Sequence, residues 1–165
     1  IQVSAGRYLP QPLVFARMIQ LAEIEKSHRV LDIAAATGYS AAVISCLAKE
    51  VVALESDSEL TASASVNLNK LEIENVNLVA GDLLQGAPEY KLYDVIIIEG
   101  TVEYVPENIL KQLKPGGRLV TVLAKEKLGN IVVIHKGDKI TTTATHFQAN
   151  ISRLEEFAKP KGFTF

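Results

Sequence analysis

The segment that decides the fold runs from residue 30 to residue 42 and reads VLDIAAATGYSAA. Its first residues form a short apolar run that predicts a buried strand, and the small residues after Ile33 predict a tight turn. The residues after Gly38 predict a helix. A strand, a tight turn and a helix in this order let a ligand approach the backbone closely, next to unpaired N–H groups and the positive end of a helix dipole.

Strand and helix patterns alternate on both sides of this segment. Short apolar runs predict strands at residues 30–33, 51–54, 76–80, 93–98 and 118–123. Helical periodicity predicts helices at residues 12–24, 41–49, 58–71 and 106–113. Strands that are almost continuously apolar pair in parallel and are buried on both faces.

The pattern changes after residue 130. Residues 131–135 and 140–145 flank a turn at Gly137, which predicts a β-hairpin. The sequence therefore predicts an α/β fold, with a doubly wound, mostly parallel, Rossmann-like seven-stranded sheet that ends in an antiparallel hairpin. Ligands of such sheets bind at the carboxyl ends of the strands.

The composition limits the class of protein. A length of 165 residues fits a single domain over residues 1–165, and 48% hydrophobic with 22% charged residues excludes a disordered chain. No apolar run approaches the ~18 residues that span a membrane, so we expect no membrane partner. The basic residues are scattered, so we expect no nucleic acid partner.

The cysteine and histidine content restricts the chemistry. A single cysteine, Cys46, excludes an internal disulfide and fits a reducing compartment, so we expect a cytoplasmic protein. One cysteine with three separated histidines also excludes a Cys/His zinc cluster, and we expect no metal. We interpret Cys46 as a small core residue, and His28, His135 and His146 as structural or surface groups.

The two ends of the chain carry less information. The chain begins at Ile1 and shows no signal-peptide pattern, so we interpret it as part of a longer protein that lacks its native N-terminal segment here. The tail is polar apart from Phe163 and Phe165, which could dock on the domain.

Acidic residues follow the next two predicted strands. Glu55 lies seventeen residues after Gly38, where a carboxylate can accept both hydroxyls of a ribose, and Asp82 follows Gly81 where it can contact an adenine edge. We expect the turn and Glu55 to contact the same adenosine-bearing ligand. The alternatives are close strand–helix packing for the turn, solvated strand ends for the acids and a generic Gly-Asp turn.

The turn resembles a known cofactor motif. Asp32-x-Ala34-x-Ala36-x-Gly38 is similar to the acidic-x-G-x-G-x-G motif of class I S-adenosylmethionine-dependent methyltransferases, whereas the dinucleotide pattern G-x-G-x-x-G is absent. More narrowly, the chain resembles protein-L-isoaspartate O-methyltransferases. Residues 6–12, GRYLPQP, align with their G-x-T-I-S-Q-P stretch, and the match continues at YDVI (93–96), Val105-Pro106 and LKPGGRL (113–119).

This resemblance implies methyl transfer from S-adenosyl-L-methionine to a free carboxylate of isoaspartyl residues, a repair reaction on damaged proteins or peptides. It places Tyr8 and Gln11 on the acceptor side as the catalytic candidates. A carboxylate acceptor is already ionised at neutral pH and needs no general base. The residues that we expect at the cofactor, from the spacing and from the resemblance together, are Asp32, Ala34, Ala36, Gly38, Tyr39, Glu55, Ser56, Asp82 and Glu99.

The sequence departs from the family pattern at several of these positions. Ala34 and Ala36 replace glycines, which costs about 1 kcal/mol or more wherever the backbone φ is positive. Pro10 replaces a serine and Tyr8 a threonine. Glu99 replaces a small or hydroxyl residue, where it would repel an anionic substrate or face the cofactor's ammonium or sulfonium group.

These departures leave other functions open. One alternative is a methyltransferase with a different acceptor, and another is an S-adenosylmethionine-binding module that has lost catalysis. A nicotinamide-dependent oxidoreductase is disfavoured by the glycine spacing and by the antiparallel end of the sheet. The oligomeric state is left open.

Overall fold

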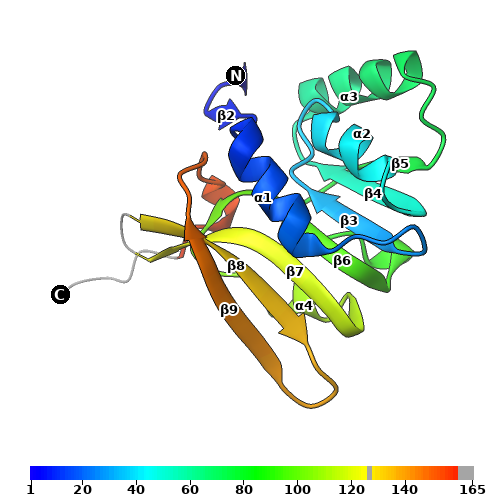
Figure 1. Ribbon diagram of the computed structural model, residues 1–165. Helices are drawn as coiled ribbons and strands as arrows, with labels where there is room; N and C mark the ends of the chain where they lie inside the picture. The colour runs from blue at the N-terminus through cyan, green and yellow to red at the C-terminus, as the bar shows by residue number, and fades with distance from the viewer. Residues whose placement is uncertain (126–127, 160–165) are drawn as a thin grey trace.

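One mixed sheet organises the chain in the computed structural model, which describes residues 1–125 and 128–159. In these residues the sheet has seven strands in the order β5-β4-β3-β6-β7-β8-β9 (Figure 1). The strands are β3 (Arg29–Ile33), β4 (Glu50–Glu55), β5 (Val76–Ala80), β6 (Tyr93–Val102), β7 (Leu113–Lys125), β8 (Leu128–Lys136) and β9 (Thr141–Gln148). The first five are parallel and the last two antiparallel, which confirms the predicted fold class.

The strand order reverses at β3. Leu31 pairs with Val52 of β4 on one side and with Ile96 of β6 on the other, both in parallel register. Ligands of open α/β sheets bind outside the carboxyl ends of the strands at such a switch point. Asp32 near the end of β3, Glu55 at the end of β4 and Glu99 in β6 therefore lie at one edge of the parallel strands.

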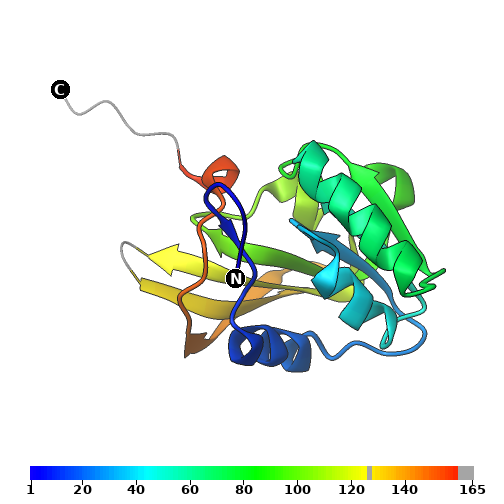
Figure 2. The same ribbon diagram turned by 90° about the horizontal axis from the view of Figure 1, so that it is seen from above.

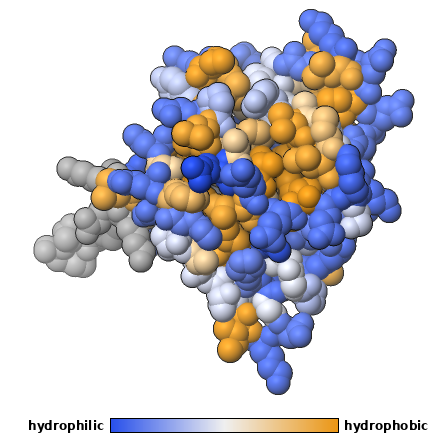
Figure 3. Space-filling model, viewed as in Figure 1, coloured by the Kyte–Doolittle hydropathy of each residue, from blue (hydrophilic) through white to orange (hydrophobic). Residues whose placement is uncertain are grey.

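Helices cover both faces of the sheet. They are α1 (Pro12–Ala22), α2 (Tyr39–Ser45), α3 (Ser58–Lys70) and α4 (Glu107–Leu110), with short 3₁₀ segments η1 (Pro88–Tyr90) and η2 (Glu155–Phe157). Met18 of α1 and Ile44 of α2 share one apolar core, while Ile109 of α4 and Phe157 of η2 belong to the core on the opposite face. Apolar side chains also gather on the surface over α1 and α2 (Figure 3).

Local sequence explains where the helices begin. Pro12 occupies the first turn of α1, where its missing N–H is no loss. Asp57 caps α3 by accepting hydrogen bonds from the backbone N–H groups of Glu59 and Leu60. Gly38 precedes α2 and has a φ of 84°. A Cβ added to Gly38 would lie 3.2 Å from the Ala64 methyl of α3, so the turn and both helices pack closely.

Two predicted helices are wrong at their ends. The helix expected over 41–49 begins at Tyr39 and stops at Ser45, because the N–H groups of Cys46 and Leu47 donate three residues back, to the Val43 and Ile44 carbonyls, and tighten the chain into a turn. The helix expected over 106–113 is reduced to α4, since Leu113 already pairs with Tyr93 in the sheet. Cys46 is exposed at the end of α2, so its interpretation as a core residue is also wrong.

A small hairpin precedes α1 and was not expected. Strands β1 (Gln2–Ser4) and β2 (Arg7–Tyr8) pair antiparallel around Gly6, whose φ is 73°. Seen from above, the hairpin lies beside the segment that carries η2 (Figure 2). Such short strands give no period-2 signal, which explains why the sequence pattern did not reveal them.

The segment after β9 returns to the centre of the sheet. The N–H of Thr101 in β6 donates to the Ser152 carbonyl at 2.8 Å, and the N–H of Leu154 donates back to the Thr101 carbonyl at 3.0 Å. Phe157 is then fully buried. The predicted docking of Phe163 and Phe165 concerns residues outside those that the structure describes.

We predict that Phe157→Ala lowers the free energy of unfolding by about 3–5 kcal/mol, because it removes a buried aromatic ring. Chemical denaturation monitored by circular dichroism measures the change. The matched control is Phe147→Ala: this ring is 45% exposed under the Arg17 guanidinium and should cost about 1 kcal/mol or less. Equal losses in the two variants would contradict a core role for η2.

Candidate functional site

The turn after β3 adopts a strained backbone. The φ angles of Ala34 and Ala36 are 67° and 49°, and the N–H groups of Ala34 and Ala35 both donate to the Leu54 carbonyl of β4. L-residues in this left-handed region carry a penalty of roughly 1–2 kcal/mol. Both alanines therefore occupy the backbone conformation that favours glycine. The cost that the sequence predicts for alanine at a positive φ applies to both positions.

Glu55 at the end of β4 is the centre of a hydrogen-bond network. Its carboxylate is fully buried and accepts from the backbone N–H of Ala36 at 2.8 Å, which joins it directly to the turn. The N–H groups of Ser56 and Asp57 donate to its other oxygen at 2.9 and 3.0 Å. The structure thus places the small-residue turn and the acidic strand end side by side.

Arg7 of the N-terminal hairpin occupies the remaining side of this carboxylate. Its two terminal nitrogens donate to Glu55 Oε2 at 2.8 Å and Oε1 at 3.2 Å, and one also approaches the Ala34 carbonyl at 3.4 Å. Ser4 fixes the hairpin by donating to Asp57 at 3.3 Å. The positions on Glu55 that two ribose hydroxyls would use are therefore filled by a guanidinium of the same chain.

Sequence reasoning missed the role of Arg7. A signal was present, because Arg7 lies in the segment 6–12 that aligns with the family motif, and the predicted site at the sheet edge is acidic. A basic residue in a segment that folds over buried carboxylates can form an ion pair with one of them. The register of the hairpin, which decides whether Arg7 reaches Glu55, depends on tertiary contacts.

Asp32 and Glu99 form the floor of the site at the ends of β3 and within β6. Ser40 of α2 donates to one oxygen of Asp32 at 2.6 Å. Burial raises the pKa of Asp32 to about 7; the Ser40 hydrogen bond opposes this rise and the Glu55 charge adds to it. Burial, and then the Asp32 charge, raise the pKa of Glu99 well above its usual value.

A small pocket lies between Glu99, the turn and the hairpin segment. Its lining includes residues 7–10 of the hairpin segment, residues 34–36 of the turn, and Tyr39, Ser40 and Glu99. Tyr39 is half-exposed and its ring lies 5.7 Å from that of Phe15 of α1. The pocket encloses about 10 Å³, space for a single water molecule, because the hairpin segment closes over it.

The other predicted residues lie around this pocket at different depths. Tyr8 lines it but is 48% exposed, while Gln11 precedes α1 and lines a separate surface hollow of about 450 Å³ that it shares with Tyr8. Ser56 is exposed beside Glu55. Asp82 is also exposed, accepts from the Leu84 N–H at 2.8 Å in a turn, and does not line the pocket.

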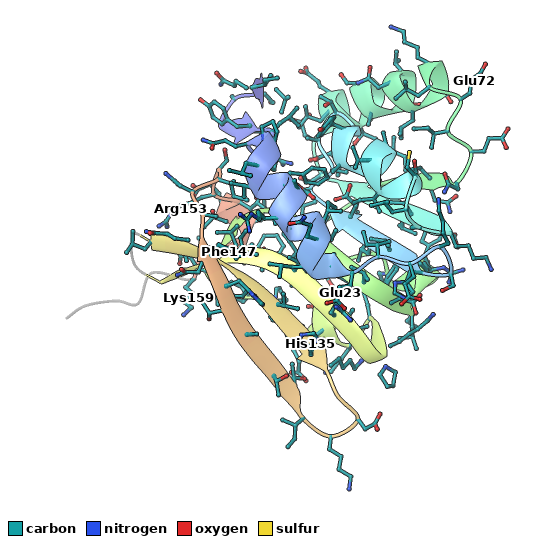
Figure 4. All side chains as sticks on the ribbon, viewed as in Figure 1. Glu23, Glu72, His135, Phe147, Arg153 and Lys159 are labelled. Carbon is teal, nitrogen blue, oxygen red and sulfur yellow. The ribbon has the colours of Figure 1, made fainter. Side chains whose placement is uncertain are left out.

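The histidines lie outside this cluster. His28 accepts a hydrogen bond from the Glu25 N–H in a turn before β3, and His135 pairs with Arg118 near the beginning of β7, toward the opposite end of the parallel strands (Figure 4). His146 lies in β9 and is exposed. In the described residues no three His, Cys, Asp or Glu side chains are arranged to hold a metal ion.

The fold is that of a Rossmann-like protein, and the candidate residues lie at its topological switch point, where ligands of open α/β sheets bind. The chain belongs to the protein-L-isoaspartate(D-aspartate) O-methyltransferase (PCMT) family, whose model matches residues 1–151. The predicted family membership is therefore confirmed.

Individual relatives agree with this assignment. The chain is 34% identical to protein-L-isoaspartate O-methyltransferase 1 of Nitrosospira multiformis, over 88% of this chain and 62% of the relative. It is 32% identical to the Koribacter versatilis protein-L-isoaspartate O-methyltransferase, over 82% and 61%. The chain thus spans about 60% of the length of these relatives.

Solved structures share the fold. A protein-L-isoaspartate O-methyltransferase superposes with a TM-score of 0.82 at 31% identity, covering 87% of this chain and 47% of the other. A Plasmodium falciparum beta-aspartate methyltransferase (PCMT), solved in complex with S-adenosyl-L-homocysteine, gives 0.77 at 19% identity over 94% and 79%.

We predict that Ala34→Gly and Ala36→Gly are each more favourable for stability than Ala35→Gly, by about 1–2 kcal/mol. All three substitutions remove a buried methyl group and add chain entropy, but only the first two relieve a positive φ. Urea denaturation of the three variants measures the difference. Equal changes in the three variants would show that the turn is not strained in solution.

Proposed function

We propose that this chain is the catalytic domain, or part of it, of an S-adenosyl-L-methionine-dependent enzyme that methylates a free carboxylate of isoaspartyl residues in damaged proteins. The observation that carries the proposal is the 2.8 Å hydrogen bond from the Ala36 N–H to Glu55, which joins the small-residue turn to an acidic strand end at the switch point. Membership of the PCMT family supports the reaction type.

The residues present fit the cofactor if the hairpin moves. Glu55 would accept the ribose hydroxyls in place of Arg7, and the turn with Tyr39 would contact the methionyl part. Ser56 and Asp82 would flank the base, which is supported by the 3.0 Å hydrogen bond from the Gly81 N–H to the Glu55 carbonyl. Bound there, the cofactor supplies an electrophilic methyl group on a sulfonium.

The protein then has to position the acceptor rather than activate it. An isoaspartyl carboxylate is ionised at neutral pH, so no side chain has to remove a proton. Tyr8 and Gln11 would hold the acceptor, which their shared surface hollow supports. Residues 7–10 would exclude water, because they already cover the pocket that Glu99 lines.

A second candidate function is a binding module that has lost catalysis. Two observations favour it: Arg7 fills the ribose position of Glu55, and Pro10 offers no hydroxyl at the pocket where the family has a serine. This module would bind an adenosine compound without turnover on a carboxylate. A methyltransferase with a different acceptor would give turnover on another substrate.

We predict opposite effects of two substitutions on S-adenosylhomocysteine binding, measured by isothermal titration calorimetry. Glu55→Gln should weaken binding about 10- to 100-fold, because it removes a charged acceptor for the ribose. Arg7→Met should strengthen binding, because the ligand no longer displaces a guanidinium and three backbone N–H groups still satisfy Glu55.

Arg17→Met provides the matched control for the loss of a basic residue, since Arg17 lies over Phe147. Its affinity should equal that of the unmodified protein. If Glu55→Gln also leaves the affinity unchanged, Glu55 does not bind the ribose.

The reaction itself is tested with a methyl-labelled cofactor and a pair of peptides that differ only in one aspartyl or isoaspartyl linkage. We predict base-labile methyl ester on the isoaspartyl peptide alone. Adenosine-compound binding without ester on either peptide would select the binding module. Equal labelling of both peptides would indicate a different acceptor.

We also propose a cytoplasmic location, with isoaspartyl proteins or peptides as partners and no nucleic acid. The single cysteine, which is exposed and cannot form an internal disulfide, supports a reducing compartment. In residues 1–125 and 128–159, every helix is too short or too polar to cross a membrane.

A further inference from the structure

Three buried carboxyl oxygens lack a hydrogen-bond partner among the described residues. They are Oδ1 of Asp32 and both oxygens of Glu99. Asp32 is fully buried and Glu99 is 7% exposed. Buried polar groups are almost always hydrogen-bonded, and leaving them without a partner is costly. Three such oxygens at one place therefore indicate that something outside the described chain completes this site.

The two side chains lie together at the switch point. Asp32 is in β3, and Glu99 follows Ile98, which pairs with Ile33 of that strand. Glu99 lines the small pocket under the hairpin segment together with the turn 34–36, while Asp32 lies behind Ser40. If the ribose of a ligand binds Glu55, the group attached to the 5′ carbon of that ribose would reach Asp32 and Glu99.

The charges around the floor favour a cation. Glu55 lies on the adjacent strand β4, and its charge acts on Asp32, while the charge of Asp32 acts on Glu99. Tyr8 and Tyr39 are the other titratable groups at the pocket. Among the residues that the structure describes, Arg7 is the one cation that lines it, and its hydrogen bonds go to Glu55 and to the Ala34 carbonyl. Asp32 and Glu99 therefore have no counter-ion among the residues that line the pocket, and a cation bound beside them would be stabilised.

We propose that Asp32 and Glu99 form a cation subsite for the methionyl end of the cofactor, and that Glu99 is a specificity-determining residue selecting a positively charged ligand there. This inference rests on the proposed function. The cation is the α-ammonium group or the sulfonium.

The test compares three ligands that differ in charge by isothermal titration calorimetry. S-adenosylmethionine carries the ammonium and the sulfonium, S-adenosylhomocysteine carries only the ammonium, and 5′-methylthioadenosine carries neither. The variants are Glu99→Gln, which keeps the shape and removes the charge, and Glu103→Gln as a matched control, since Glu103 pairs with Arg153 outside the pocket.

We expect Glu99→Gln to weaken S-adenosylmethionine binding about tenfold or more and to change methylthioadenosine binding less than twofold. A parallel loss for S-adenosylhomocysteine would assign the subsite to the ammonium, and no loss would assign it to the sulfonium. Glu103→Gln should bind all three ligands as the unmodified protein does. Thermal unfolding confirms that both variants are folded.

Proton release provides a second measurement that a purely structural role would not affect. A bound cation favours the ionised carboxylates, so S-adenosylmethionine should release protons at neutral pH, seen as a dependence of the binding heat on the buffer's ionisation enthalpy. Glu99→Gln should release fewer protons.

Unchanged S-adenosylmethionine affinity in Glu99→Gln, or an equal loss for all three ligands, would overturn the cation subsite while leaving the proposed function intact. If none of the ligands binds the unmodified protein, the proposed function fails and the subsite fails with it.

Discussion

The buried carboxylate of Glu55 is the interaction on which the arrangement of this site depends. It accepts a hydrogen bond from the Ala36 N–H of the turn and hydrogen bonds from the N–H groups of Ser56 and Asp57, which lead from β4 into α3. It also pairs with Arg7 of the N-terminal hairpin. A carboxylate that accepts several charge-assisted or backbone hydrogen bonds is held in one orientation. Three segments that are distant in sequence are therefore positioned by one side chain, and a ligand that takes over the Arg7 contacts would leave the other two in place.

The three buried acids of the site, Asp32, Glu55 and Glu99, differ in whether a counter-ion balances them. Glu55 has a counter-ion in Arg7, whereas Asp32 and Glu99 have none that the structure describes, and mutual repulsion with burial keeps this pair from ionising fully. An anionic acceptor entering the pocket first would meet these acids directly. A cationic ligand bound beforehand would balance them. Under the proposed function, this charge balance favours binding of the cofactor before the carboxylate acceptor.

Much of the architecture could be predicted from the sequence, because buried parallel strands have continuous apolar sequences and their polar residues lie at the strand ends. The adjacency of the turn and Glu55 followed from the same rule, since neighbouring parallel strands end at one edge. Arg7 was not predicted, because its contact depends on how the short hairpin folds back. The lack of partners for Glu99 was also invisible, since burial and hydrogen bonding are tertiary properties. The early end of α2, which leaves Cys46 exposed, reflects a local turn that apolar periodicity does not register.

The return of the chain to β6 has a consequence for synthesis. Thr101 lies two residues after Glu99 and exchanges backbone hydrogen bonds with Ser152 and Leu154, so the strand that carries the pocket floor is completed by residues made about fifty positions later. In a nascent chain the first parallel strands can pair early, but this end of β6 has only β7 beside it, through the pairing of Thr101 with Val122, until residues 152–154 have left the exit tunnel. The free side of β6 next to Glu99 is therefore completed later in synthesis than the contact between the turn and Glu55.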